Sequence, residues 1–586
     1  MASPSHTAGS VAMDSDTKRG PVLRAARDFA PGDLVLCETP LVCTAQQDPA
    51  LKSVDARLMP HVLALQQICK SSEAVRQEVE GMTCPDLGHT HDIIAEAGEA
   101  ARIVFAGSGM FGAYGWARGV SESSLHRCAV AFHVHALQYQ DDTRALFSLG
   151  SKLVHSCIPN THYSPTEGLG RHMALAHIKK GDIVTTSHLG LLHIESTPRR
   201  RAHLYKTRLL VCSCPRCSGP DLSRQLPCPH CHPRDPKEPT VPEDVAFERK
   251  PVHYVVCTLK PKDEDCPPSP DAFTASWTCQ ICARSFPDTK LGFDLDMERQ
   301  LQDRVIALDP SSKGMDWDEL MQWFMACLHT LGRRHWLVVK MNTMMSELLQ
   351  STLRSSKQLT DDEKDRYSDE LIGCLSWIWQ WFVDARCSPL LYSEAFLTGT
   401  NVLYRLASHG MKLEDFSLSC CWFYPWVQLL KGDEAEDTQA ALQAIKHASK
   451  LKGFSPSVAN ANELLRDTLK GKGNEIFAKG EEDQGKFWEA ILWYSTAVFV
   501  CPTDAVLYSN RSVSFQKLAL YDEAVRDAVT CIALKPDWAK GHFRLATAYK
   551  EMGRVAEAKR VVKDAKKLAP DDEAIAMLVR QLKKMG

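Results

Sequence analysis

The spacing of apolar residues changes along the chain from strand-like to helix-like. Residues 21–44 alternate apolar and polar side chains around a Pro-Gly-Asp turn, which predicts a hairpin of short strands. The spacing is helical over residues 49–139, strand-like runs return at 173–178 and 183–189, and beyond residue 291 the pattern is helical almost to the end. This order of elements predicts an α+β fold followed by an all-α region.

An internal repeat occupies the C-terminal part of the chain. Pro502, Pro536 and Pro570 recur at intervals of 34 residues, which is the tetratricopeptide period. Residues 505–518 and 521–534 carry apolar side chains at helical spacing, so each repeat is predicted to be a pair of helices.

Length and composition limit the classes of function. A chain of 586 residues is too long for one hydrophobic core and predicts several domains. With 44% hydrophobic and 24% charged residues and a net charge of -3, it lacks the basic excess of a direct nucleic-acid binder. The most apolar late stretch, residues 371–383, is too short to span a bilayer, so we expect no membrane anchor.

Cysteine usage points to metal binding. The 22 cysteines come without a secretory signal, which predicts a reducing compartment where clustered thiols serve as metal ligands. Three of them, Cys212, Cys214 and Cys217, lie within six residues and need a fourth ligand from elsewhere. Two Cys-x-x-Cys knuckles together complete a second tetrahedral site, made of Cys228, Cys231, Cys279 and Cys282.

Other ligand sets remain open for these sites. The possible substitute ligands are His230, His232, Cys257 and Cys266, and the alternative to metal binding is a set of scattered core cysteines. Closed sites of four thiolates leave no open coordination position. We therefore expect about two Zn²⁺ ions that stabilise the fold instead of activating water.

One stretch carries a family resemblance. The run Leu-Val-His-Ser-Cys-Ile-Pro-Asn at residues 153–160, followed by residues 174–188 and the Cys212 cluster, resembles the C-terminal half of a SET domain with its post-SET zinc loop. The nearest pattern is the SET and MYND domain family, in its arthropod-type branch, and residues 27–32 are similar to its opening hairpin. The resemblance covers about residues 20–220, without the MYND module.

The resemblance implies an S-adenosylmethionine-dependent protein-lysine methyltransferase. It implies Cys157 as the fourth ligand of the Cys212 cluster and a cofactor site that includes Gly20, His155 and Asn160. His188 stands at the usual channel tyrosine and is the candidate catalytic base.

Several positions depart from that family's pattern. Val154 replaces an asparagine, His188 a tyrosine, and Arg208-Leu209-Leu210 an aromatic run. Valine cannot hydrogen-bond to the cofactor, and histidine is shorter than tyrosine with a different pKa. The alternative hypothesis is therefore a catalytically inactive SET-fold adaptor that binds chaperones or other proteins.

The repeat region resembles the tetratricopeptide domains of heat-shock co-chaperones over about residues 462–570. The matching stretches are 470–474, 508–512 and 535–544. In such domains a carboxylate clamp holds the Glu-Glu-Val-Asp tails of chaperones, and the positions implied here are Lys470, Asn474, Asn510, Lys540 and Arg544. Spacing of four residues places Lys470 with Asn474, and Lys540 with Arg544, on one helix face each. The alternative is a solvated basic face.

These observations predict five segments and an intracellular protein in the cytoplasm, with the nucleus left open. The segments are a disordered arm (1–19), a SET domain with a helical insertion (20–211), a post-SET and second zinc module (212–290), a helical region (291–460) and a tetratricopeptide domain (461–586).

Overall fold

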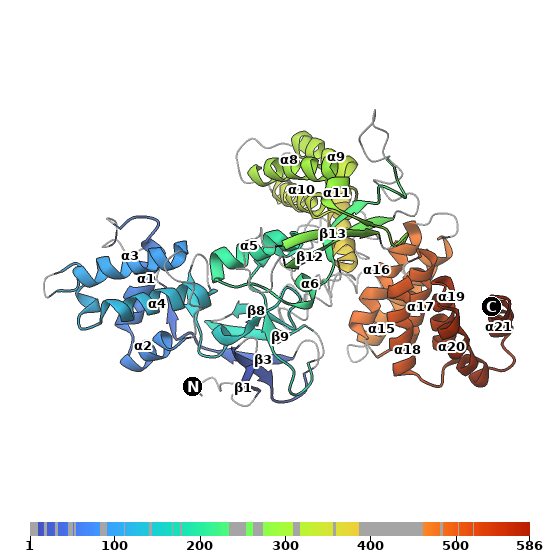
Figure 1. Cartoon of the computed structure of the whole chain (residues 1–586), viewed down its shortest axis with the longest axis horizontal. Coiled ribbons are helices and arrows are strands. Elements are labelled where there is room, and N and C mark those ends of the chain that lie inside the picture. Colours follow the sequence, from blue (N-terminus) through green and yellow to red (C-terminus); the bar gives the residue numbers. More distant parts are fainter. Residues whose placement is uncertain are drawn as a thin grey trace.

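The computed structural model describes residues 10–16, 20–29, 33–44, 51, 54–82, 91–109, 112–139, 143–166, 168–175, 178–233, 253–261, 273–279, 281–308, 317–354, 359–385, 461–480, 485–501, 503–519 and 521–585. Figure 1 shows a helical lobe beside a group of small sheets, with a helical bundle and a domain of paired helices beyond them. The expected combination of sheets and helices, ending in an all-helical domain, is confirmed.

The small sheets combine strands that are neighbours in the sequence with strands that lie far apart in it. β1 (Val11–Asp16) pairs with β2 (Gly20–Ala25), and β3 (Leu34–Glu38) pairs with β9 (Leu169–Ala174), which also pairs with β8 (Thr161–Thr166). β4 (Val42–Cys43) and β5 (Leu137–Gln138) flank β6 (Arg144–Leu146), and β7 (Val154–His155) runs parallel to β10 (Thr185–Thr186).

These pairings correct two expectations. The hairpin predicted over residues 21–44 is wrong in its pairing, because β2 pairs with β1 and β3 pairs with β9. Strand β1 also lies within the arm that we expected to be disordered. A continuous ladder with β2 holds it, and Arg24 Nε forms an ion pair with Asp14 Oδ2 at 2.6 Å. Of the strand-like runs at 173–178 and 183–189, the structure realises only short pieces in β9 and β10.

The helical lobe consists of α1 (Met59–Lys70), α2 (Glu73–Glu80), α3 (Asp92–Ala106) and α4 (Glu122–His135). Its core combines large residues of α1, such as Leu65, with small residues such as Ala97 and Ala129, which let α3 and α4 approach closely. Ser72 and Ser121 accept hydrogen bonds from backbone N–H groups of the first turns, which fixes where α2 and α4 begin.

A four-stranded sheet joins the cysteine region to the helical bundle. α5 (Thr197–Arg208) and α6 (Pro215–Ser218) lead into the antiparallel sheet β11 (Asp221–Pro227), β12 (Tyr254–Pro261), β13 (Phe273–Cys279) and β14 (Ser285–Phe286). The bundle contains α8 (Gly292–Ala307), α9 (Trp317–Leu331), α10 (Trp336–Arg354) and α11 (Asp361–Asp384). Trp277 of the sheet and Trp336 of the bundle are fully buried in one shared core.

A buried ionic cluster fastens this bundle to the sheet. Arg224 of β11 contacts both carboxylate oxygens of Glu298 on α8 at 2.6–3.0 Å, and His335 Nε2 lies 3.1 Å from Glu298 Oε1. Burial by itself would raise the pKa of Glu298, but Arg224 and then His335 outweigh it and hold that pKa well below its ordinary range.

The C-terminal domain is a series of helix pairs. Its elements are α15 (Ala461–Ala478), α16 (Gly485–Val500), α17 (Ala505–Lys517), α18 (Tyr521–Leu534), α19 (Ala539–Glu551), α20 (Val555–Leu568) and α21 (Glu573–Lys584). The predicted helices 505–518 and 521–534 are confirmed as α17 and α18. Asp504 and Asp572 cap the starts of α17 and α21 by accepting hydrogen bonds from backbone N–H groups.

Some expectations lie outside the described residues, among them Cys266 and the part of the predicted helical region at residues 386–460. In the part of the chain that the structure describes, no helix combines the length and apolarity needed to cross a membrane.

Candidate carboxylate clamp and thiol clusters

Four cysteines from two distant segments meet in the first thiol cluster. Cys157 follows β7, whereas Cys212, Cys214 and Cys217 lie after α5 and within α6. Their sulfur atoms lie within 4.8 Å of one another, and Cys157 Sγ is 3.4 Å from Cys217 Sγ and 3.9 Å from Cys212 Sγ. Tetrahedral zinc with bonds of about 2.3 Å separates its sulfur ligands by roughly 3.8 Å, so this donor set fits such an ion.

Two arginines of α5, which the sequence reasoning missed, support this cluster. Arg201 donates hydrogen bonds to the carbonyl oxygens of Cys212 (3.3 Å) and Cys217 (3.1 Å), which holds the cysteine loop against the helix. The fully buried Arg200 places Nη2 at 3.8 Å from Cys217 Sγ. Positive charge at this distance favours thiolates as ligands. The run of three arginines at residues 199–201, which ends 11 positions before Cys212, was the available sequence signal.

His155 connects this cluster to the segment that carries His188. Its Nε2 lies 3.4 Å from Cys157 Sγ, and its Nδ1 accepts a hydrogen bond from His188 N at 3.1 Å. Because Nδ1 is an acceptor, the neutral ring carries its proton on Nε2, facing the sulfur. Burial lowers the pKa of His155 to about 4, so the ring is neutral at pH 7. Both nitrogens of this predicted cofactor ligand are therefore engaged within the protein.

Asn160, a second predicted cofactor ligand, holds the segment that leads into β10. Its Oδ1 accepts hydrogen bonds from Thr185 N (2.7 Å) and Thr185 Oγ1 (3.1 Å), and its Nδ2 donates to Ile183 O (2.8 Å). The backbones of Arg24 in β2 and Ile183 form an isolated antiparallel β-bridge, so the strand that begins at Gly20 adjoins the same segment. The structure thus brings the strand of Gly20 and Asn160 together, and one amide N–H of Asn160 has no partner within the described part of the chain.

His188, the predicted catalytic residue, stacks on His155 with ring centroids 5.5 Å apart. Its Nδ1 is buried and has no hydrogen-bond partner among the described residues. Burial and then the Arg208 guanidinium hold the pKa of His188 well below its usual range. A neutral imidazole therefore occupies this position at pH 7.

The second thiol cluster joins two tight turns of the four-stranded sheet. Cys228 and Cys231 follow β11, and Cys279 and Cys282 lie at the turn from β13 into β14. All four sulfur atoms lie within 4.8 Å of one another, with Cys228 Sγ 3.9 Å from Cys282 Sγ. Cys282 N donates to Cys279 Sγ at 3.4 Å, which fixes the turn around the sulfurs.

The substitute ligands are not needed to complete this set of four. His232 Nε2 accepts a hydrogen bond from His253 N at 2.9 Å, and Cys257 lies within β12 opposite Trp277. His230 Nδ1 is 3.9 Å from a cluster sulfur, but the four thiols assemble without it.

In the repeat domain, Asn474 and Asn510 come together from α15 and α17. Asn510 Nδ2 donates to Asn474 Oδ1 at 3.1 Å, and Tyr494 Oη of α16 donates to the same oxygen at 2.8 Å. Gly473 is required here, because a side chain at this position would begin 2.6 Å from the Tyr494 ring. With its oxygen saturated, the exposed Asn474 presents only N–H donors to a ligand. Sequence reasoning missed Tyr494.

Lys540 and Arg544 lie one turn apart on α19. Arg544 is half-buried, and its Nε has no hydrogen-bond partner among the described residues. Burial lowers the pKa of Arg544, and burial followed by the Arg544 charge lowers the pKa of Lys540. Within the described residues no carboxylate pairs with either cation. An anion bound here would therefore offset the free-energy cost of holding the two positive charges close together and partly buried.

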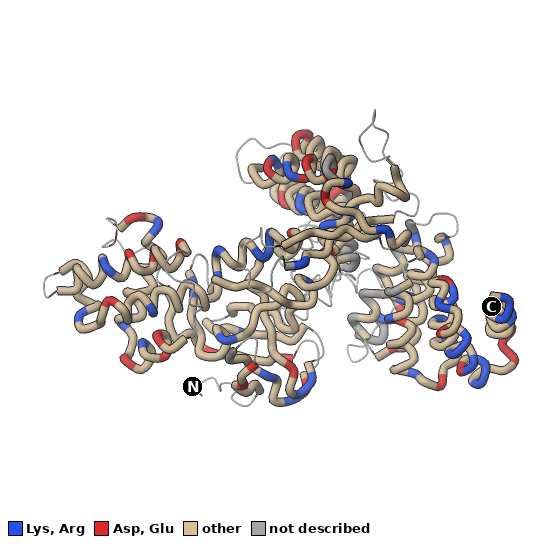
Figure 2. The backbone as a smooth tube through the Cα atoms, viewed as in Figure 1, with Lys and Arg blue, Asp and Glu red and all other residues tan. Residues whose placement is uncertain are grey.

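Lys470 and Arg511 differ from this pair. Lys470 Nζ already contacts Asp467 Oδ1 on its own helix at 2.9 Å. Arg511 is bound by both carboxylate oxygens of Asp527, at 2.7 and 2.8 Å, and serves the packing of α17 on α18. Lys and Arg also recur along α20 (Figure 2), so basic charge alone does not single out Lys540 and Arg544. What distinguishes this pair is burial, which lowers the pKa of both side chains and leaves the buried Nε of Arg544 without a hydrogen-bond partner among the described residues.

Comparison with known proteins identifies the repeat domain. The sequence model of the family described as Tetratricopeptide repeat matches residues 520–582. The Hsp70-Hsp90 organizing protein of Triticum aestivum is 36% identical over 120 residues, which are 20% of this chain and 20% of that protein. Stress-induced-phosphoprotein 1 of Caenorhabditis elegans is 31% identical over 169 residues, 29% of this chain and 49% of that protein. This chain thus spans about a fifth of the first of these relatives and half of the second.

Solved structures of repeat domains are also similar. The first TPR of Spaghetti (RPAP3) bound to the HSP90 peptide SRMEEVD is 27% identical, with a TM-score of 0.19, over 20% of this chain and 90% of that one. The second TPR domain of human RPAP3 in complex with the HSP70 peptide SGPTIEEVD is 25% identical, with a TM-score of 0.20, over 21% of this chain and 98% of that one. The C-terminal part of this chain is therefore a tetratricopeptide region with homology to Hsp70-Hsp90 organizing proteins.

Proposed function

We propose that the repeat domain binds the C-terminal tails of heat-shock chaperones through a carboxylate clamp. The observation that carries this proposal is the pair Lys540 and Arg544, which have no carboxylate partner among the described residues. A chain-terminal carboxylate would form charge-assisted hydrogen bonds with them, and the amide N–H groups of Asn474 and Asn510 would bind further oxygens.

The test is binding of a fluorescent peptide that ends in Glu-Glu-Val-Asp to the full chain, followed by anisotropy. Saturable binding that Arg544→Ala weakens supports the clamp. Binding that is absent, or that Arg544→Ala leaves unchanged, rejects it. Lys472→Ala is the matched control, because Lys472 lies on α15 but pairs with Glu475 at 3.0 Å.

We infer that the N-terminal part is a SET-type scaffold with two structural Zn²⁺ ions. Cys157, Cys212, Cys214 and Cys217 would hold one ion, and Cys228, Cys231, Cys279 and Cys282 the other. The support is the approach of sulfurs from distant segments to 3.4–3.9 Å, which ordinary core cysteines have no reason to adopt. Each ion would link segments that lie far apart in the sequence, so its binding energy would contribute directly to folding.

Two functions are candidates for this scaffold. The first is S-adenosylmethionine-dependent protein-lysine methyl transfer, with Gly20, His155 and Asn160 at the cofactor and His188 as base, on a substrate recruited by the repeats. The second is a non-catalytic adaptor, and it is favoured by His155, because both of its ring nitrogens are engaged within the protein. Calorimetric titration with S-adenosylmethionine separates them: saturable heat supports the enzyme, and its absence supports the adaptor.

A further inference from the structure

Two guanidinium groups meet at one carbonyl oxygen where α4 ends. Arg208 Nη1 donates to Val134 O at 2.6 Å and to Ala136 O at 2.7 Å. Arg144 Nη2 donates to His133 O and to the same Ala136 O, both at 2.9 Å. The shared oxygen of Ala136 thus holds two positive charges side by side.

Neither cation has an acidic partner among the described residues. Other arginines of α4 and α5 do: Arg127 of α4 pairs with Glu80, and Arg199 of α5 pairs with Glu195 at 2.6 Å. Burial, and then the nearby Arg144, lowers the pKa of Arg208 to about 9, the direction expected for a buried cation beside a like charge.

Capping of the helix end accounts for only part of this charge. The C-terminus of a helix carries roughly half a negative charge, so the last carbonyls of α4 offset about a quarter of two full positive charges. A cap would also need one guanidinium instead of two. The remaining positive charge is available to a ligand, and both arginines are half-buried, so part of each stays accessible.

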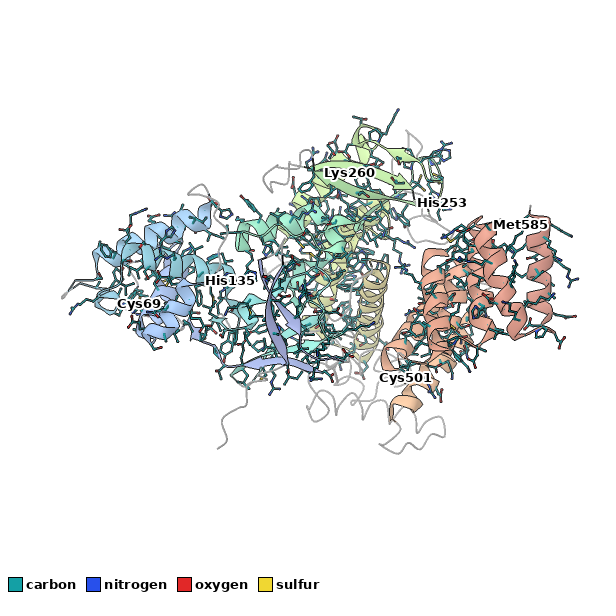
Figure 3. All side chains as sticks on the ribbon, turned by 60° about the horizontal axis from the view of Figure 1, so that its bottom comes forward. Cys69, His135, His253, Lys260, Cys501 and Met585 are labelled. Atoms are coloured by element: carbon teal, nitrogen blue, oxygen red, sulfur yellow. The ribbon has the colours of Figure 1, made fainter. Side chains whose placement is uncertain are left out.

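The charge of Arg208 also acts on His188, whose pKa it lowers. Its pKa is lowered by burial, then by Arg208 and by three other imidazoles, those of His155, His135 and His172. His135 ends α4 where the helical lobe meets the small sheets (Figure 3) and its Nδ1 lies 3.1 Å from Ser151 O. The Nδ1 atom of the neutral His188 ring has no hydrogen-bond partner among the described residues.

We propose that Arg144 and Arg208 form a binding site for a small oxyanion group, a carboxylate or a phosphate. Guanidinium groups recognise both through paired hydrogen bonds, and an anion would neutralise the two adjacent cations. The site is separate from the peptide clamp and does not depend on the SET resemblance.

The test follows the thermal unfolding midpoint of the full chain in sodium acetate and in sodium phosphate, each at pH 7 and matched in ionic strength with sodium chloride. A site-bound anion raises the midpoint saturably, because ligands that bind only the folded state stabilise it. We expect such a rise in wild type and an apparent affinity at least ~10-fold weaker in Arg208→Gln. The anion that acts at the lower concentration identifies the class of ligand.

Three further variants make the result specific. Arg127→Gln, an exposed and ion-paired arginine of α4, keeps the response, as does the clamp variant Arg544→Ala. If Arg208→Gln folds poorly, Arg144→Lys takes its place as the test. It retains the charge but loses the planar guanidinium group, so we expect it to weaken the response. No rise beyond chloride in wild type, an equal rise in both Arg144→Lys and wild type, or loss of the rise in Arg544→Ala would overturn the proposal.

Discussion

Asn510 of α17 donates a hydrogen bond of 3.1 Å to the side-chain oxygen of Asn474, which lies on α15 in the preceding helix pair. The bond fixes the orientation of both amides across two repeats. The N–H groups of Asn474 are thereby reserved for a ligand, and this preorganisation lowers the entropy lost on binding.

Arg544→Ala should weaken binding of a Glu-Glu-Val-Asp peptide by about 2 kcal/mol, or ~30-fold, because it removes a half-buried cation from a charge-assisted contact. Lys540→Ala, at a more exposed position, should cost about half as much in free energy. Calorimetric titration measures both. The Lys472→Ala control should bind within about twofold of wild type, and an equal loss in this control would mean that general charge, not the clamp, attracts the peptide.

Asp467→Asn should tighten peptide binding. Asp467 Oδ1 forms an ion pair with Lys470 Nζ at 2.9 Å, so the carboxylate of a ligand must compete with Asp467 for this ammonium group. Exposed ion pairs contribute roughly 0.2 to 1 kcal/mol, which predicts about 1.4- to fivefold higher affinity. Glu475→Gln on the same helix is the matched control and should leave the affinity unchanged, since Glu475 pairs with Lys472 and Lys479. Weaker binding by Asp467→Asn would place Lys470 outside the clamp.

Purified protein should contain about two zinc ions per chain, as measured by elemental analysis. Cys157→Ser should remove one ion and lower the unfolding temperature, because the first site links β7 to the loop after α5. Cys231→Ser should remove the other ion. Cys257→Ser, which changes a buried cysteine outside both clusters, should retain two. Full zinc content in Cys157→Ser would contradict the assigned ligands.

Glu298→Gln should destabilise the bundle at pH 7 by about 3 kcal/mol, since it leaves Arg224 buried without its counter-charge. The pKa of Glu298 is lowered in the folded state, so its contribution is present above the ordinary value of 4.5 and is lost as pH falls toward the folded pKa. The difference between wild type and variant should therefore shrink below about pH 4. Denaturation midpoints at several pH values measure it, and a difference that grows on acidification would contradict this account.

The spacing of residues predicted some features well and others not at all. Periodicity placed α17 and α18 to within a residue, because regular apolar spacing determines helix packing locally. The pairing of β3 with β9 was not predictable, since it joins segments more than 100 residues apart and no turn specifies it.

The sites differ in the same way: the thiol clusters were predictable from the sequence, whereas the arginine pair and Tyr494 were not. Short Cys-x-x-Cys spacing predicts a thiol cluster, because the two cysteines of each knuckle are close in the sequence. The approach of Arg144 to Arg208 has no such signature: 64 positions separate them, and only the fold reveals that both bind Ala136. Tyr494 was missed for the same reason, because its partner Asn474 lies on another helix.

The most direct test of the clamp compares two forms of one peptide by calorimetric titration of the full chain. The peptide ends in Glu-Glu-Val-Asp, and its C-terminus is either a free carboxylate or an amide. We predict that the free acid binds with a stoichiometry of one and that the amide binds at least ~30-fold more weakly, because it removes the charge that Lys540 and Arg544 are placed to receive. Equal affinity for the two forms would contradict the account.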